Sequence, residues 1–105
     1  FEQVAQQTRW TDLHVLRALA RSHYLAGDVA GGRSVSRRVL RLSPTCVASL
    51  SNLGLASLQE RRLREASGWI QRGLRAHPAD EGLRQLRFKL LLHRIKKMCR
   101  SVVGL

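Results

Sequence analysis

The sequence repeats itself with a period of 34 residues, and this period limits the folds that the chain can adopt. Pro44 and Pro78 lie 34 positions apart, and each closes a segment rich in Leu and Arg. The same shift aligns further pairs: Leu16 with Leu50, Leu19 with Leu53, Arg38 with Arg72, Leu40 with Leu74 and Arg41 with Arg75. A fixed period of this length is typical of a solenoid, in which each unit buries its apolar face only against its neighbours.

Each repeat is predicted to form a helix, a turn and a second helix. The first repeat covers residues 13–46 and the second covers 47–80, and in both the apolar residues recur at helical spacing. Gly27 is predicted to end the first helix of the first repeat, since Gly is the commonest residue just beyond a helix. Pro44 and Pro78 are predicted to end the second helices, because the residue before a proline disfavours helical geometry. The predicted fold class is all-α, a solenoid of helical hairpins.

Two further segments flank the repeats. Residues 1–12 are interpreted as the tail of a preceding repeat, with Thr11 or Asp12 as the N-cap of the helix that follows. Residues 81–105 are predicted to form a basic C-terminal capping helix, with Asp80 as its N-cap. Its apolar residues at helical spacing are predicted to pack on the second repeat: Leu83, Leu86, Leu90, Ile95, Met98 and Val102.

The chain is strongly basic. It has 19 Lys and Arg residues against 7 Asp and Glu, which gives a formal net charge of +12. Charge of this sign favours anionic partners, whether acidic protein segments, nucleic acid or lipid headgroups. An apolar content of 44% supports a packed core and argues against a disordered tail.

The two cysteines, Cys46 and Cys99, are predicted to be free thiols. Neither belongs to a CxxC motif, and their number is too small for a disulfide-stapled secreted protein. The longest apolar run, Leu90–Leu92, is three residues, whereas a membrane-spanning helix needs about 20. We therefore expect an intracellular protein of the cytoplasm or nucleus, without a membrane span.

The sequence offers little chemistry for an enzyme. Its seven acidic residues are scattered, and no GxSxG, GxxxxGK or HExxH motif occurs. The four histidines are too dispersed for the spacing of a metal site: His14, His23, His77 and His93. We expect no enzymatic activity, no cofactor and no bound metal.

The repeat resembles the tetratricopeptide repeat over roughly residues 1–80. The resemblance is carried by the 34-residue period, the closing prolines and small residues where paired helices approach closely: Ala20, Gly54 and Ala66. The first repeat departs from the family pattern at two positions. Gly32 stands where Ala is usual in the second helix, and Ser36 stands where a large apolar residue is usual.

The resemblance implies a concave groove lined by the first helix of each repeat. Carried over onto this sequence, the groove positions are His14, Arg17, Arg21, Tyr24, Ser51, Asn52, Leu55, Gln85 and Lys89. Arg17 and Arg21 are four positions apart, so their guanidinium groups share a helix face and either bind carboxylates or phosphates or are simply solvated. Asn52 would offer its amide to the backbone of an extended peptide. The family's clamp for chaperone tails is incomplete, because Gly82 and Leu86 stand where basic residues are needed.

The second helices are predicted to carry a basic stripe on the convex side. Its members are Arg33, Arg37, Arg38, Arg41, Arg72 and Arg75. Such a stripe can neutralise the phosphates of RNA or DNA, but aromatic side chains that would stack on bases are scarce. A charge run is usually a solvated face, and acidic protein surfaces are the favoured counterpart.

The C-terminal helix has more apolar residues than one face needs. Phe88, Leu91 and Leu92 are predicted to point away from the second repeat, beside a basic rim that includes Arg94, Lys96 and Lys97. Either a partner covers these apolar residues, or the helix bends back and covers them itself. The first alternative is favoured, since an apolar centre with a polar rim is the usual anatomy of an interface.

These features predict a non-enzymatic scaffold or adaptor that binds an acidic or extended segment of a partner protein within a multi-protein assembly. The alternative is a basic helical-repeat module that contacts RNA or DNA phosphates. The salt dependence of binding distinguishes the two hypotheses, because phosphate contacts release counterions.

Overall fold

The computed structural model describes the backbone of residues 2–103 and the side chains of residues 12–100. Five helices make up this part: α1 (Glu2–Leu25), α2 (Val29–Leu42), α3 (Val47–Gln59), α4 (Leu63–Ala76) and α5 (Glu81–Val103). Within residues 2–103 there is no strand, so the all-α prediction is confirmed.

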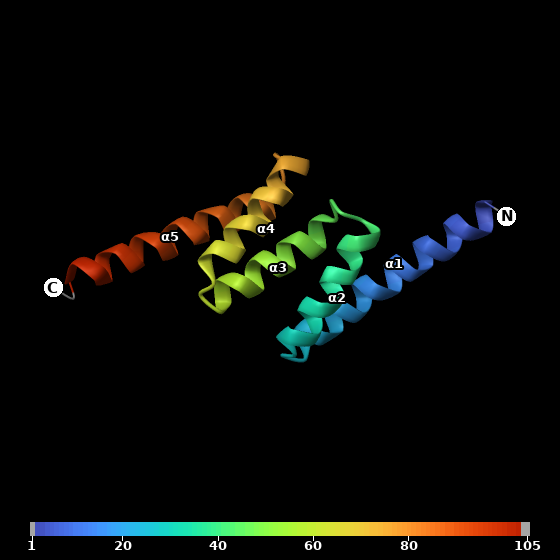
Figure 1. Cartoon of the computed structure of the whole chain (residues 1–105), viewed down its shortest axis with the longest axis horizontal. Helices are drawn as coiled ribbons and strands as arrows, with labels where there is room; N and C mark the ends of the chain where they lie inside the picture. Colours follow the sequence, from blue (N-terminus) through green and yellow to red (C-terminus); the bar gives the residue numbers. More distant parts are fainter. Residues whose placement is uncertain (1, 104–105) are drawn as a thin grey trace.

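The helices follow one another along an elongated molecule whose principal extents are 66 × 29 × 18 Å. α1 packs on α2 and α3 packs on α4, while α2 also contacts α3 and α5 contacts both α3 and α4 (Figure 1). α1 and α5 point outward at opposite ends, with α3 in the middle. Sequence neighbours are therefore also spatial neighbours throughout.

The turn between α1 and α2 forms where the sequence predicts it. Gly27 has a φ of +82°, a left-handed conformation that Gly adopts without steric cost. Asp28 then caps α2, since one carboxylate oxygen accepts a hydrogen bond from the Gly31 N–H at 3.0 Å. The other oxygen lies 2.9 Å from His23 Nδ1. The Gly–Asp pair thus ends one helix and begins the next.

The bounds of the helices recur at the period of the sequence. α2 begins at Val29 and α4 begins at Leu63, which is 34 positions later, and α3 and α5 begin at Val47 and Glu81 with the same offset. The positive φ recurs as well, because Arg61 (φ 60°) stands 34 positions after Gly27. The predicted ends of α2 and α4 before their prolines are confirmed.

α1 is longer than the sequence predicts. It runs from Glu2 to Leu25 without a break, so the expectation that Thr11 or Asp12 caps a separate helix is wrong. The physical reason is that no Gly or Pro occurs between Glu2 and Leu25, and Trp10 occupies the repeat position that Pro44 holds later. Residues 2–12 therefore continue the first helix.

The core consists of two apolar clusters that meet on α3. One contains Leu40, Leu50 and Leu53, with Trp69 packed against it. The other joins α3 and α4 to α5: Leu58, Ala66, Ile70, Leu83, Leu86 and Leu90. Small residues let the helices approach, since a Cβ on Gly54 would lie only 3.2 Å from Ile70 Cγ1.

We call α1 with α2 the first hairpin and α3 with α4 the second. Polar contacts fix α4 of the second hairpin to the turn between α2 and α3. Arg72 Nη2 donates to the Pro44 carbonyl at 3.1 Å, and His77 Nε2 donates to the Thr45 carbonyl at 2.8 Å. On the other side, the Arg33 guanidinium of α2 pairs with Glu60, which caps the end of α3. These contacts supplement the apolar packing between hairpins.

Among the described side chains of α5, those buried against the rest of the molecule all lie in its first half. Leu83, Leu86 and Leu90 are buried as predicted, and Asp80 caps the helix by accepting from the Leu83 N–H at 2.9 Å. The prediction that Ile95 and Met98 pack on the second repeat is wrong, because both are exposed.

Ile95 and Met98 are exposed because α5 is longer than the helices on which it packs. α3 and α4 meet in a turn at residues 60–62, and α5 continues beyond it as one helix to Val103. The side chain of Val102 lies outside the described residues. The alternative in which the helix bends back is also wrong, since Phe88, Leu91 and Leu92 remain exposed on an unbroken helix.

Leu83→Ala is expected to lower the free energy of unfolding by about 2–5 kcal/mol, because it leaves a cavity in the core. Leu83 is 0% exposed and sits over Gly73 of α4. Leu91→Ala, in the same helix but 52% exposed, is the matched control and should change stability by less than about 1 kcal/mol. Urea unfolding followed by circular dichroism measures both. Equal effects would contradict the packing of α5 through Leu83.

Candidate interaction surface

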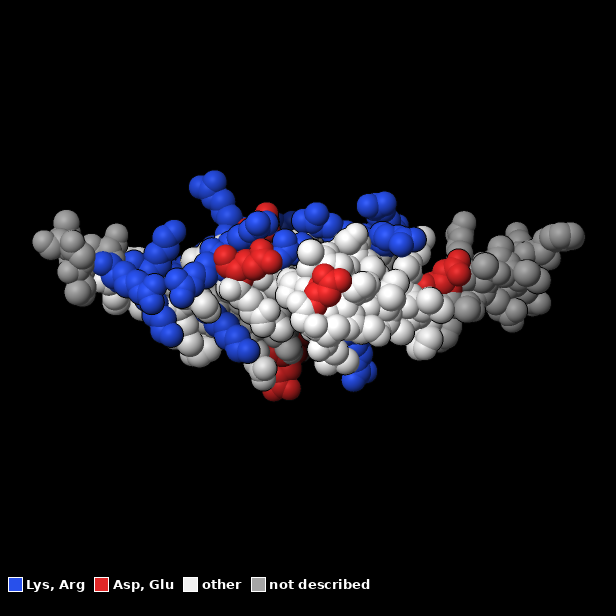
Figure 2. Space-filling model, turned by 90° about the horizontal axis from the view of Figure 1, so that it is seen from below, with Lys and Arg blue, Asp and Glu red and all other residues white. Residues whose placement is uncertain are grey.

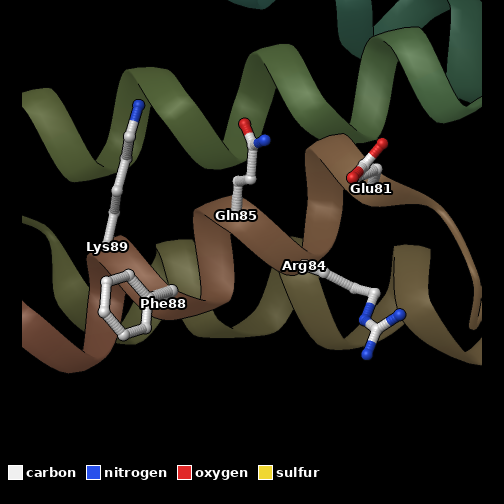
Figure 3. A pocket seen from close by; sticks show the side chains of 5 residues that line it. All are labelled: Glu81, Arg84, Gln85, Phe88 and Lys89. Atoms are coloured by element: carbon white, nitrogen blue, oxygen red, sulfur yellow. The ribbon is translucent and has the colours of Figure 1, made fainter.

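The predicted groove residues beyond the first repeat lie on α3 and α5, two helices that contact each other. On α3, Ser51 and Asn52 are half-buried and Leu55 is exposed. Gln85 and Lys89 extend from α5 toward α3 (Figure 3). They line an open hollow of about 410 Å³ together with Glu81, Arg84 and Phe88. Glu81 and Arg84 are lining residues that the sequence did not predict.

The groove residues predicted on α1 form a separate group. His14, Arg17 and Arg21 are exposed on the first helix, and none of them lines the hollow on α5. The predicted groove residues therefore form two groups, one on α1 and the other on α3 and α5.

Tyr24 does not stand in the groove as predicted. Its ring lies against Gly32, where an added Cβ would be only 2.7 Å from a ring carbon, and its hydroxyl is 3.1 Å from the Ser36 hydroxyl. Tyr24 is half-buried, and Leu58, its counterpart 34 positions later, is buried. The ring therefore packs between α1 and α2.

This contact explains the two departures from the repeat pattern. Gly32 leaves room for the ring of Tyr24, and Ser36, which is fully buried, supplies a partner for its hydroxyl. A large apolar residue at either position would clash with the ring. The two unusual residues in the sequence were a signal for this contact, although only the structure shows which aromatic side chain they accommodate.

Two members of the predicted basic stripe contact other parts of the chain, so the stripe is only partly available to a partner. Arg33 is an error in that prediction, because its side chain is 16% exposed and pairs with Glu60. Arg72 is exposed, but its guanidinium lies 5.9 Å from the centre of the Trp69 ring and bonds the Pro44 carbonyl. Four members remain exposed without such contacts among the described residues: Arg37, Arg38, Arg41 and Arg75.

Positive charge is concentrated at the α5 end and along one edge of the molecule. In the face shown in Figure 2, Lys and Arg side chains gather over the C-terminal helix and along the upper edge, whereas the middle consists of uncharged residues with acidic side chains among them. The predicted rim residues Arg94, Lys96 and Lys97 are all exposed on α5. From residue 82 to 100 the described part of α5 contains no acidic residue.

α5 carries an exposed apolar stripe, which we define as Phe88, Leu91, Leu92, Ile95 and Met98. These side chains are between 41% and 68% exposed. At about 100° of rotation per residue they lie about 150° around the helix from the buried Leu83, Leu86 and Leu90. The sequence predicted the first three members, and Ile95 and Met98 enlarge the surface.

Basic residues flank the apolar stripe on both sides. Arg87 and Arg94 follow one edge, and Lys89, Lys96 and Arg100 follow the other, according to helical geometry. A hollow of about 550 Å³ runs along Phe88 and Leu91 with arginines at its border: Arg84, Arg87 and Arg94. The arrangement is an apolar centre with a cationic rim.

The His, Cys, Asp and Glu side chains of the described residues lie apart from one another or serve in local contacts. No group of three His, Cys, Asp or Glu side chains within the described part of the chain can hold a metal ion. Several carboxylates serve in helix caps or ion pairs: Asp28, Glu60, Glu65 and Asp80. In the same part of the chain, no helix combines the length and apolar character required to cross a membrane.

Comparison with known protein families, with curated proteins and with solved structures finds no match for this chain. The geometry and charge of its surfaces are thus the basis for assigning a function.

Tyr24 is expected to ionise at a higher pH than a free tyrosine. Burial raises the pKa of its phenol above the ordinary value of 10.0, although the Ser36 hydrogen bond and the charges of Arg33 and Arg37 act in the opposite direction. The pKa of Tyr24 is thus higher in the folded than in the unfolded state. The stability that the protonated phenol contributes is therefore complete below the unfolded pKa, and it is lost as pH rises through the folded pKa.

The chain has one tyrosine, so an absorbance titration of the phenolate reports on Tyr24 alone. Ser36→Ala removes the hydrogen bond and should raise the midpoint further. A midpoint at or below that of the unfolded chain would contradict the packing described for the ring.

Proposed function

We propose that this chain is a segment of a tetratricopeptide-like solenoid that acts as a non-enzymatic scaffold. Two features support the repeat assignment: the bounds of α2 and α3 recur in α4 and α5 at the period of the sequence, and each helix packs on its sequence neighbours. A solenoid unit presents open faces on its terminal helices, where further elements or partners dock.

The observation that supports the proposed function is the apolar stripe of α5, which is flanked on both sides by the basic residues of the cationic rim. Five exposed apolar side chains in one helical stripe form a surface that favours burial by a partner, at about 1.5–3 kcal/mol for each side chain fully covered. The flanking cations select for negative charge on the partner. The partner segment is accordingly an amphipathic helix with an apolar face and acidic flanks.

A second copy of the same chain fits this surface poorly. Each copy would bring Arg87, Arg94, Lys89 and Lys96 next to the same cations of the other, and like charges across an interface oppose association. The hollow that contains Gln85 and Lys89 adjoins the stripe through Phe88, so an acidic partner can contact both.

Nucleic acid is the second candidate partner, because Lys and Arg gather along one edge of the molecule (Figure 2). A phosphate-binding surface should lose affinity steeply with salt, with a slope of about 0.9 in log K for each phosphate contacted on a duplex. A partner held by apolar contacts should give a much shallower slope. Binding titrations at several salt concentrations therefore separate the two candidates.

Phe88→Ser combined with Leu92→Ser is expected to weaken binding of the protein partner at least about tenfold while leaving the melting temperature within about 2 °C, since the fold does not bury these residues. Quantitative affinity capture with the chain as bait, followed by titration of the captured proteins, measures the first effect. Thermal unfolding measures the second.

Leu25→Ser combined with Leu42→Ser is the matched control. Leu25 and Leu42 are 78% and 55% exposed but lie outside α5, so this variant should retain its partners. Equal loss in both variants would point to non-specific adhesion, and a marked fall in melting temperature with intact binding would place Phe88 and Leu92 in the core. Either result would overturn the proposed docking surface.

A further inference from the structure

A cationic hollow lies on a different face of α5 from the apolar stripe. Its volume is about 310 Å³, and it opens between the turn that joins α3 to α4 and the free half of α5. The lining residues are Arg61 and Leu63 from the turn and the start of α4, and His93, Lys96, Lys97 and Arg100 from α5. Five of these six residues are basic types, and no carboxylate lines the hollow.

The positive charge of this hollow is not balanced by ion pairs among the described residues. The acidic residues nearest in sequence to Arg61 have other partners, because Glu60 pairs with Arg33 and lies 3.4 Å from Arg62 Nε. Glu65 also contacts Arg62, at 3.8 Å. No ion pair involves Arg61, Lys96, Lys97 or Arg100 among the described residues. Like charges held close together repel, and an anion between them removes the repulsion.

The backbone at Arg61 indicates that its side chain has a role. Arg61 has a φ of 60°, a left-handed conformation that disfavours residues with a Cβ. The corresponding position in the first hairpin is Gly27, which adopts a φ of +82° without that penalty. An arginine in place of glycine is unfavourable for the turn itself, and this arginine lines the hollow.

We propose that this hollow binds a compact anion that carries several phosphate groups. Guanidinium groups from two separate elements can each donate two parallel hydrogen bonds to phosphate oxygens, and the lysine ammonium groups add point charges. The hollow has one apolar lining residue, Leu63, and so lacks the apolar floor that an extended peptide needs. The site shares Lys96 and Arg100 with the basic rim of the docking surface proposed above, but none of its lining residues belongs to the apolar stripe.

Calorimetric titration of the chain with inorganic tripolyphosphate at physiological ionic strength tests the proposal. We expect one site per chain and a loss of affinity of at least tenfold in Lys97→Gln combined with Arg100→Gln. Arg38→Gln combined with Arg41→Gln removes the same charge from exposed positions on α2 and should reduce affinity less than threefold.

Arg61→Gly is expected to weaken binding and to raise thermal stability, two effects of opposite sign. The variant should bind tripolyphosphate at least fivefold more weakly and should melt at a higher temperature than the original chain, since glycine suits the left-handed turn. A merely structural role of Arg61 would lower the melting temperature instead.

Three results would overturn the site: no saturable binding of tripolyphosphate, equal losses in the two double variants, or unchanged affinity in Arg61→Gly. Binding of duplex DNA that both double variants weaken equally, without one-site binding of tripolyphosphate, would assign the charge to general nucleic-acid attraction.

Discussion

The architecture depends on the burial of α3 among its neighbours. This helix contacts α2, α4 and α5, and its leucines belong to both core clusters. Such close surroundings are possible because small residues alternate with leucines along it, and Ser49, Gly54, Ala56 and Ser57 are all buried. With α3 enclosed in this way, the first half of α5 packs on a fixed apolar surface. The described residues of its second half project into solvent.

Most of the helix bounds could be predicted from the sequence because they depend on local chemistry. Gly27, Pro44 and Pro78 act on the backbone within one turn of their own position, and Asp80 caps the helix that it precedes. The break expected at Thr11 did not form, since a residue that is able to cap a helix does not by itself end the helix that precedes it.

The candidate surfaces were harder to predict because they depend on distant parts of the chain. Helical spacing identified the second apolar stripe of α5, but it does not say where the covering helices stop, and so Ile95 and Met98 were assigned to the core. Arg33 looked like one of a row of surface arginines, yet its partner Glu60 is 27 residues away. The meeting of Arg61 with the far half of α5 has no sequence signal at all, because it depends on the angle at which α5 leaves the hairpin.

The contact between Tyr24, Gly32 and Ser36 has an evolutionary consequence. A side chain larger than hydrogen at position 32 collides with the ring, so Gly32 cannot change while Tyr24 remains. Conversely, a leucine at position 24 would free position 32 for alanine and position 36 for an apolar residue, as in the second hairpin, where Leu58, Ala66 and Ile70 fill the corresponding space. The three positions are thus expected to covary in descendants of this chain, and the order of change is constrained, because the aromatic ring has to be lost first.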